Sequence, residues 1–245
     1  IFKQGLARPN QGIRALLDPL VKKTNELGVK RLMNSGVQQI NSDHDQVTEI
    51  VMENGEIFTA DQIISTCGVV ETEELLNPKK INSIKTEEGK FSVIETISVF
   101  NGKPKDFGWD ETIVFFNDSE KFRYEQPEGT VDLSSGVICL PENYQDPQNQ
   151  EKKEARLRIT NPANFIKWAA LDEPKYQEEK RKCESQMLDK ALSYLPNGSN
   201  QKDAFLDATV LNDTFTPRTI KKYTNHANGA LYGSPRKSRT GSTNL

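Results

Sequence analysis

The stretch QVTEIVMENGEIFTADQIIST, Gln46 to Thr66, points to a β-hairpin and sets the expected fold class. Apolar residues recur among polar ones in QVTEIVME, a pattern typical of a half-buried strand. Asn54-Gly55 follows at once, and Asn-Gly is a strong signal for a tight hairpin turn. The residues from Glu56 to Thr66 are therefore expected to return as a second strand.

The residues before this hairpin predict one helix and two short strands. From Asn10 to Leu27, apolar residues recur in steps of three and four, as they do on one face of a helix. Gly28 is well placed to end that helix, whereas Pro19 removes a backbone donor inside it and could kink it. VKRLMN, Val29 to Asn34, and VQQIN, Val37 to Asn41, read as strands. The apolar positions of the helix are Ile13, Leu16, Leu17, Leu20, Val21 and Leu27.

The residues after the hairpin predict a larger mixture of strands and helices. Helices are expected over Val70 to Leu76, over Pro174 to Leu195 and from Thr216-Pro217 onward, where threonine and proline make a good helix start. Strand patterns occupy most of the region between. They are FSVIETISVF, ETIVFFN, EKFRYE, SGVICLP, ARLRIT and AFLDATVLND. The prediction is an α+β fold whose larger sheet is antiparallel or mixed.

Composition excludes several classes of protein. The 245 residues carry a net charge of -3, which favours neither nucleic acid nor an anionic membrane. The three cysteines are far apart and only two histidines occur, so a metal cluster is not expected. No apolar run reaches the roughly 18 residues that a transmembrane helix needs.

Motif searches find no self-contained catalytic site. The sequence has no GxGxxG, no GxxxxGK[ST] and no GxSxG. His44 is read as a solvated turn residue, and His226 as a structural hydrogen-bonding residue more readily than a catalyst. No nucleophile, base and orienting residue can be assembled from spacing, so no catalytic residue is assigned.

Three stretches of the sequence, taken together, resemble a known protein family. Pro9 to Leu76, together with FIKWAALDEPKYQEEKRK and TPRTIKKYTNHANGALYG, resembles the phytoene-desaturase-like, carotenoid-isomerase-like family of FAD-dependent oxidoreductases. A glycine-containing helix start, a strand and a pattern "V..V.l.nGe...AD.viS" carry the resemblance. The matching residues are Gly12, Gly28, Val37, Ile40, Val47, Ile50, Asn54, Gly55, Glu56, Ala60, Asp61, Ile64 and Ser65.

The resemblance implies a division of the chain and a set of cofactor contacts. Residues 1–85 would be part of a FAD-binding domain, a helix plus a β-meander. Residues 86–215 would be the substrate-binding domain, and 216–245 would return towards the FAD domain. The implied FAD contacts are Val37, Ser65, Thr66 and Cys67 on the adenine side, and Gly229, Tyr232 and Gly233 where flavin and substrate meet.

The resemblance also implies a reaction and its partners. FAD would serve the desaturation, saturation or isomerisation of a polyene or similar apolar substrate in a cytoplasmic protein, which allows for peripheral attachment to a membrane. Because the pyrophosphate-binding GxGxxG of the family is missing, the chain is expected to be a central fragment that is inactive alone and binds FAD weakly or not at all. Two alternatives stay open, a non-enzymatic binding or scaffold protein and another FAD branch such as an amine oxidase.

The return segment carries one further expectation. Asn228 to Ser234 contains two glycines, and its apolar residues Ala230, Leu231 and Tyr232 need a surface to pack on. In the family that surface belongs largely to other parts of the FAD domain. The segment is therefore expected to be poorly ordered in this chain. The competing outcome is that Tyr232 packs against the substrate domain.

Overall fold

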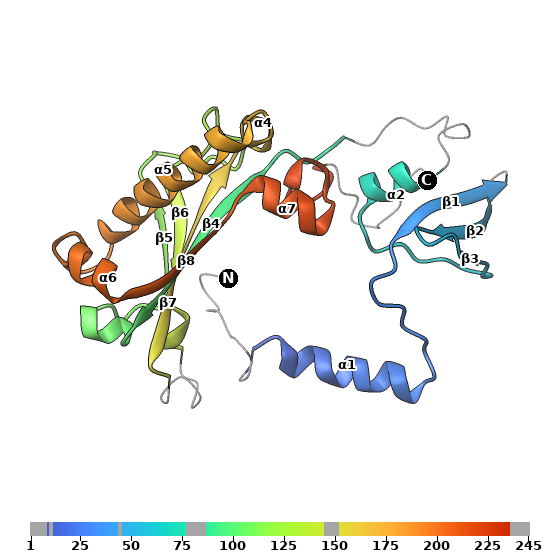
Figure 1. Ribbon diagram of the computed structural model, residues 1–245, viewed down its shortest axis with the longest axis horizontal. Coiled ribbons are helices and arrows are strands. Elements are labelled where there is room, and N and C mark those ends of the chain that lie inside the picture. Colours follow the sequence, from blue (N-terminus) through green and yellow to red (C-terminus); the bar gives the residue numbers. More distant parts are fainter. Residues whose placement is uncertain (1–8, 10–11, 44–45, 77–86, 145–151, 236–245) are drawn as a thin grey trace.

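The computed structural model describes residues 9, 12–43, 46–76, 87–144 and 152–235. It contains two antiparallel sheets, one of three strands and one of five, with helices between and beside them (Figure 1). This arrangement confirms the predicted α+β class. His44 and the predicted boundary between residues 85 and 86 lie outside the described residues.

The first helix, α1, spans Arg14–Glu26 and matches the predicted range. Gly28 follows it with φ 71°, a backbone conformation that glycine adopts at little cost, and its N–H bonds to the carbonyl of Asn25. Pro19 lies inside the helix, as expected. None of the residues of α1 is buried, and its apolar side chains, including Leu16 and Leu20, are exposed.

The small sheet contains the predicted hairpin. β1 (Val37–Asp43) and β2 (Gln46–Met52) pair along their length, and Gly55, with φ 83°, makes the turn that follows β2. The return strand is much shorter than predicted, because only β3 (Ile57–Phe58) pairs with β2. Beyond β3, Ile64 is 87% exposed, so its apolar side chain is not buried as it would be in a packed strand. The predicted strand over Val29 to Asn34 is also wrong, since no strand pairs with it.

Helix α2 (Val69–Leu75) confirms the predicted helix and lies beside the small sheet. A parallel bridge joins Leu76, which follows α2, to Ile40 of β1. This contact fixes the C-terminal end of α2 against the small sheet.

The large sheet has the order β5-β6-β7-β4-β8, and every pair in it is antiparallel. Its strands are β4 (Ser92–Asn101), β5 (Ile113–Asn117), β6 (Ser135–Cys139), β7 (Glu154–Ala163) and β8 (Thr209–Phe215). Two strand predictions need correction. Residues 120–125 are irregular, and residues 202–208 form helix α6 (Lys202–Ala208), which buries Phe205 in an aromatic cluster before β8 begins.

Three helices cover one face of the large sheet (Figure 1). They are α4 (Phe165–Ala169), α5 (Glu173–Leu192), which confirms the long predicted helix, and α6. Asp172 caps α5 by accepting a hydrogen bond from the N–H of Lys175 at 3.0 Å. Alternate strand residues on this face form the core with Met187 and Leu192 of α5. They include Ile94, Phe100, Ile138, Leu157 and Ile159.

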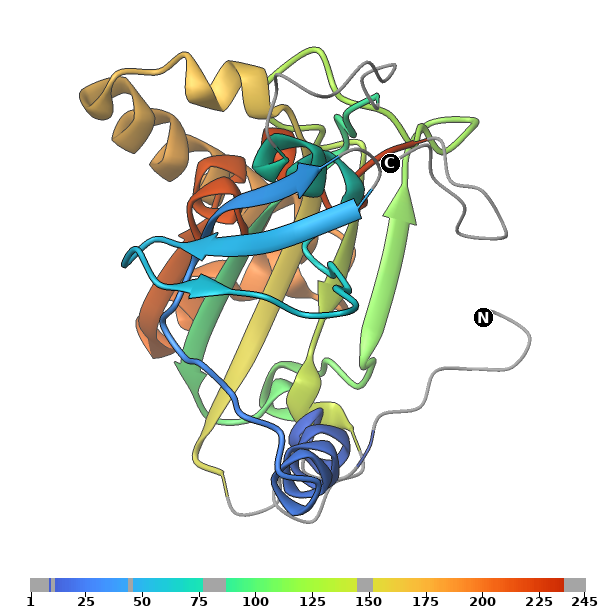
Figure 2. The same cartoon turned by 90° about the vertical axis from the view of Figure 1, so that its right-hand side faces the viewer.

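The chain then leaves β8 through α7 (Pro217–Thr224), capped by Thr216 as predicted. Asn225 ends α7 in the left-handed conformation, and a short 3₁₀ turn, η4 (Ala227–Gly229), follows. The other short turns are η1 (Pro104–Phe107), η2 (Pro141–Asn143) and η3 (Gly198–Gln201). In Figure 2 the three-stranded sheet stands in front of the large sheet, on the side away from α5.

Candidate functional site

The face of the large sheet opposite α5 is not covered by a helix among the described residues (Figure 1). Side chains of directly paired residues share a face, so the strand registers identify its members. One row runs Phe115, Val137, Thr160, Glu95 and Phe215. The next runs Ile113, Cys139, Arg158, Ile97 and Asp213, and Arg156, Val99 and Leu211 lie beyond. We call this surface the open face.

The open face is largely apolar and accessible. Phe115 is 53% exposed, Leu211 58% and Phe215 39%, although each sits on a regular strand. A sheet face with this composition is normally packed against another layer. The open face is therefore suited to binding an apolar partner or ligand.

A polar cluster lies in the middle of the open face. Glu95 accepts two hydrogen bonds from Arg158 at one carboxylate oxygen, at 3.0 and 2.7 Å, and one from Thr160 at the other, at 3.0 Å. Partial burial raises the pKa of the neighbouring Cys139 thiol, so this cysteine remains protonated.

A groove of about 540 Å³ lies where the segment before β4 meets the return segment. Residues 87–91, 124–126 and 230, 232–235 line it. Tyr124 stacks on Phe91 at 4.2 Å between ring centroids and lies 5.9 Å from the ring of Tyr232. Partial burial, together with a hydrogen bond to Tyr232, raises the pKa of Tyr124 to about 12, so the phenol stays neutral and able to donate. Phe91 stands two residues before Val93, so the groove adjoins the open face.

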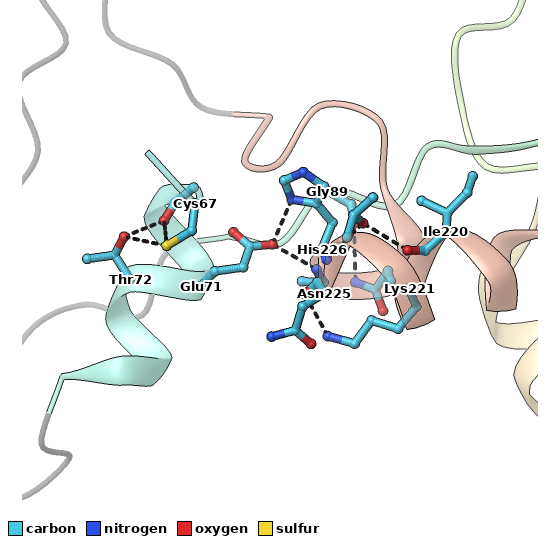
Figure 3. Close-up of polar contacts among 12 residues, drawn as sticks. Cys67, Glu71, Thr72, Gly89, Ile220, Lys221, Asn225 and His226 are labelled. Carbon is cyan, nitrogen blue, oxygen red and sulfur yellow. Dashed lines mark hydrogen bonds and ion pairs between the residues drawn. The ribbon is translucent and has the colours of Figure 1, made fainter. Parts of the chain in front are cut away.

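Glu71 joins α2 to the return segment (Figure 3). Only 4% of this residue is exposed, and its Oε1 accepts hydrogen bonds from the N–H of Ala227 at 2.9 Å and from Nδ1 of His226 at 3.1 Å. Burial works against its ionisation, but the hydrogen bonds from Ala227 and His226 outweigh it and hold the pKa of Glu71 below its usual value. His226 is thus a structural hydrogen-bonding residue, as the sequence favoured.

The lowered pKa of Glu71 predicts a pH-dependent attachment. A carboxylate with a depressed pKa stabilises the fold above its ordinary pKa, and that contribution is lost as the pH falls through the lower, folded value. Glu71→Gln should lower the free energy of unfolding by about 1–2 kcal/mol at neutral pH, since a charge-assisted hydrogen bond becomes a neutral one. Urea unfolding at several pH values should show this difference shrinking in acid. Glu74→Gln, on the exposed side of α2, is the control; a difference that stays constant with pH would contradict the account.

The predicted adenine-side residues lie close to this attachment. Ser65 and Cys67 precede α2, where their side chains contact each other at 3.2 Å and both contact Thr72 (Figure 3 shows Cys67 and Thr72). Val37 opens β1, opposite Met52. No hydrogen bond among the described residues joins Val37 to Ser65, Thr66 or Cys67, although α2 and β1 are neighbours. The FAD contacts assigned to these four residues remain predictions.

The predicted flavin-side residues divide into two groups. Tyr232 and Gly233 line the groove, whereas Gly229 is used for packing. Gly229 has φ 54°, a Cβ there would stand 2.5 Å from the carbonyl oxygen of Pro217, and its own carbonyl accepts a 2.6 Å hydrogen bond from Ser92. The expected lack of a packing surface is wrong for part of this segment, because Ala230 is 1% exposed and Ser234 3%. Leu231 is 43% exposed, and Tyr232 is 55% exposed although it lies against Tyr124. Fast amide exchange over Asn228 to Ser234 stays a prediction.

Gly229→Ala should test this packing role. The substitution adds a Cβ in a left-handed conformation and against backbone, so we expect a loss of about 2–3 kcal/mol in the free energy of unfolding. Gly55→Ala is the matched control, since φ there is 83° but nothing lies within 4 Å of the added Cβ. It should lose about 1 kcal/mol. Equal losses measured by denaturant unfolding would remove close packing as the reason for this glycine.

Several residues of the site gave no signal in the sequence. Glu71 sits in an ordinary helical turn, and Glu95, Arg158 and Tyr124 come from three separate segments. Only strand register or long-range contact brings them together. Among the described residues, no group of three or more histidine, cysteine or carboxylate side chains could hold a metal ion. The described part of the chain also has no helix with the length and apolar character that a membrane crossing demands.

Comparison with known proteins places the chain in a flavoprotein family. Residues 1–183 match the family described as flavin containing amine oxidoreductase, so the chain belongs to this family of FAD-dependent oxidoreductases. Within it, the chain is similar to the phytoene desaturase of Neurospora crassa, with 34% identity over 95 residues. That alignment covers 36% of this chain but only 16% of the length of the relative.

Proposed function

We propose that the chain forms the substrate-binding wall, and part of the flavin site, of a FAD-dependent oxidoreductase that acts on a polyene or similar apolar molecule. The observation that supports this most directly is the open face, an accessible apolar surface on a rigid sheet. A long hydrocarbon bound along it would remove apolar area from water on both partners, which is the main driving force for such binding.

The residues present fit one part of FAD and not another. The aromatic walls of the groove, Tyr124 and Tyr232, suit a flat ring system, and the volume lies within the range of small-molecule sites. The sequence supplies no GxGxxG to cradle a pyrophosphate. FAD would accept or donate the hydride, and we expect this chain alone to bind it weakly or not at all.

The chain's own residues would position the substrate and keep water away. The rows of side chains on β5, β6, β7, β4 and β8 define a track, so an extended molecule would lie across the strands. The neutral phenol of Tyr124 would end this track beside the groove. Exclusion of water from the track protects reactive intermediates of hydride chemistry.

Amine oxidation is the second candidate, and the groove favours it. Glu87, Glu88 and Glu125 line the groove beside the aromatic rings, and aromatic faces combined with carboxylates suit an ammonium group. Lys90 lines the same groove and weakens this attraction. A binding or scaffold protein without catalysis is the remaining alternative.

Anaerobic reduction of FAD bound to the full-length gene product would test the proposal. Mixing it with partly saturated polyenes, phytoene and a hydroxylated derivative of it, should bleach the yellow flavin absorbance with at least one of them, and benzylamine should not. Bleaching by benzylamine alone would favour amine oxidation. Stable flavin absorbance with all three compounds, despite bound FAD, would favour the binding protein.

A further inference from the structure

The polar cluster of the open face carries information about the substrate, given the proposed function. A hydrocarbon offers no hydrogen bond, so a wall made only for hydrocarbons gains nothing from a guanidinium at its centre. Arg158 is flanked in its row by Cys139 and Ile97, and Glu95 by Thr160 and Phe215. A ligand spanning the sheet would therefore cover the charged pair together with its apolar neighbours.

The geometry leaves one side of the guanidinium unused. Nε and Nη2 of Arg158 donate to Oε1 of Glu95, and Thr160 occupies Oε2. Nη1 has no acceptor within the part of the chain that the structure describes, and 44% of the Arg158 side chain is exposed. The carboxylate thus holds the arginine in place while donors remain available to a ligand.

The charge balance indicates what kind of acceptor fits. Glu95 already neutralises Arg158, and Asp213 in the same row is paired with Lys180 at 3.7 Å, so the row has no unbalanced positive charge. A carboxylate from the ligand would lose water here without a free countercharge. An uncharged oxygen, such as a hydroxyl or a keto group, would accept the hydrogen bond at a smaller desolvation cost.

We propose that Arg158, oriented by Glu95 and Thr160, binds one uncharged oxygen atom of the substrate, and that the substrate is an oxygenated polyene rather than a pure hydrocarbon. Arg158 acts here as a specificity-determining residue. Glu95 and Thr160 are positioning residues, because they act only through the guanidinium.

Three polyenes that share one carbon skeleton test the proposal by equilibrium binding to this chain. Retinol carries one hydroxyl, axerophtene is the hydrocarbon analogue without it, and retinoic acid carries a carboxylate. Retinol should bind about threefold to tenfold more tightly than axerophtene, the gain expected of one hydrogen bond in a site without water. Retinoic acid should bind more weakly than retinol.

Variants assign the preference to one side chain. Arg158→Met should remove the preference for retinol over axerophtene, although the Glu95 carboxylate that it leaves unpaired should weaken the binding of both polyenes. Arg158→Lys should keep part of the preference. The double variant Glu95→Gln/Arg158→Met removes the unpaired carboxylate as well, so it should remove the preference without that general weakening. Arg156→Met is the matched control, because Arg156 lies on the same face of β7, opposite Val99, and donates to Glu142 through the same two nitrogens, but stands one row away from Glu95 and Thr160.

The outcomes separate this inference from the proposed function. Equal binding of retinol and axerophtene by the wild type would overturn the inference alone. A preference that survives Arg158→Met, or that Arg156→Met removes equally, would also overturn it. Absence of binding by all three polyenes would overturn the proposed function as well.

Discussion

Replacing Trp168 with alanine should lower the free energy of unfolding by roughly 3–5 kcal/mol, the usual cost of removing a large buried ring. Trp168 is fully buried between α4 and the sheet. Its Nε1–H donates to the carbonyl of Thr130 at 2.9 Å, and its ring makes an edge contact with Tyr176 at 5.7 Å. The substitution would leave a cavity and an unpaired carbonyl under the helices. Denaturant unfolding measures the loss.

Phe115→Ala on the opposite face of the same sheet is the control. Phe115 is 53% exposed, so its removal should cost less than about 1 kcal/mol. Similar losses for the two variants would mean that the open face is part of the folding core, and it would then not be available for a ligand.

Val137→Asp should weaken the binding of axerophtene by about a hundredfold, because a carboxylate covered by a hydrocarbon loses its water without gaining a partner. Val137 lies on β6 between Phe115 and Thr160, near the middle of the open face, and no cation is paired directly opposite it. Equilibrium titration followed by polyene fluorescence or absorbance gives the affinity.

Two further variants make this result specific. Leu211→Asp, at a more exposed position of the open face, should weaken binding even if Val137→Asp fails to fold. Val47→Asp makes the same chemical change on β2 of the small sheet and should leave the affinity unchanged. Equal weakening by Val47→Asp would attribute the effect to net charge rather than to the open face.

Local patterns in the sequence predict most of the fold. β4, β7, α5 and α7 carry strong periodicity or caps, and each forms close to its predicted range. The failures share a cause, since residues 29–34, 59–66 and 120–125 have strand-like composition but no neighbouring strand to pair with. Strand formation depends on a partner that local sequence does not reveal. Residues 204–208 were misread because their apolar residues fit either a strand or one turn of helix around Phe205.

The candidate site is less predictable than the fold. The family resemblance led to Tyr232 and Gly233, which do line a groove. The open face could not be predicted, because strand order and register decide that Phe115, Val137 and Phe215 share one surface. Similarly, Glu71 and Ala227 stand 156 positions apart in the sequence, so no local pattern predicts the contact that fixes the return segment.

The claim that the open face binds an apolar substrate is tested most directly by methyl-resolved NMR of this chain during titration with axerophtene. We predict shifts for the methyl groups of Ile97, Val99, Val137 and Leu211, and unchanged positions for Ile94, Leu157 and Ile159 on the covered face. Leu16 and Leu20 of α1 are the internal control for nonspecific binding to exposed apolar side chains, because their exposed fractions are similar to that of Leu211. Shifts confined to α1, or no saturable shifts on the open face, would contradict the account.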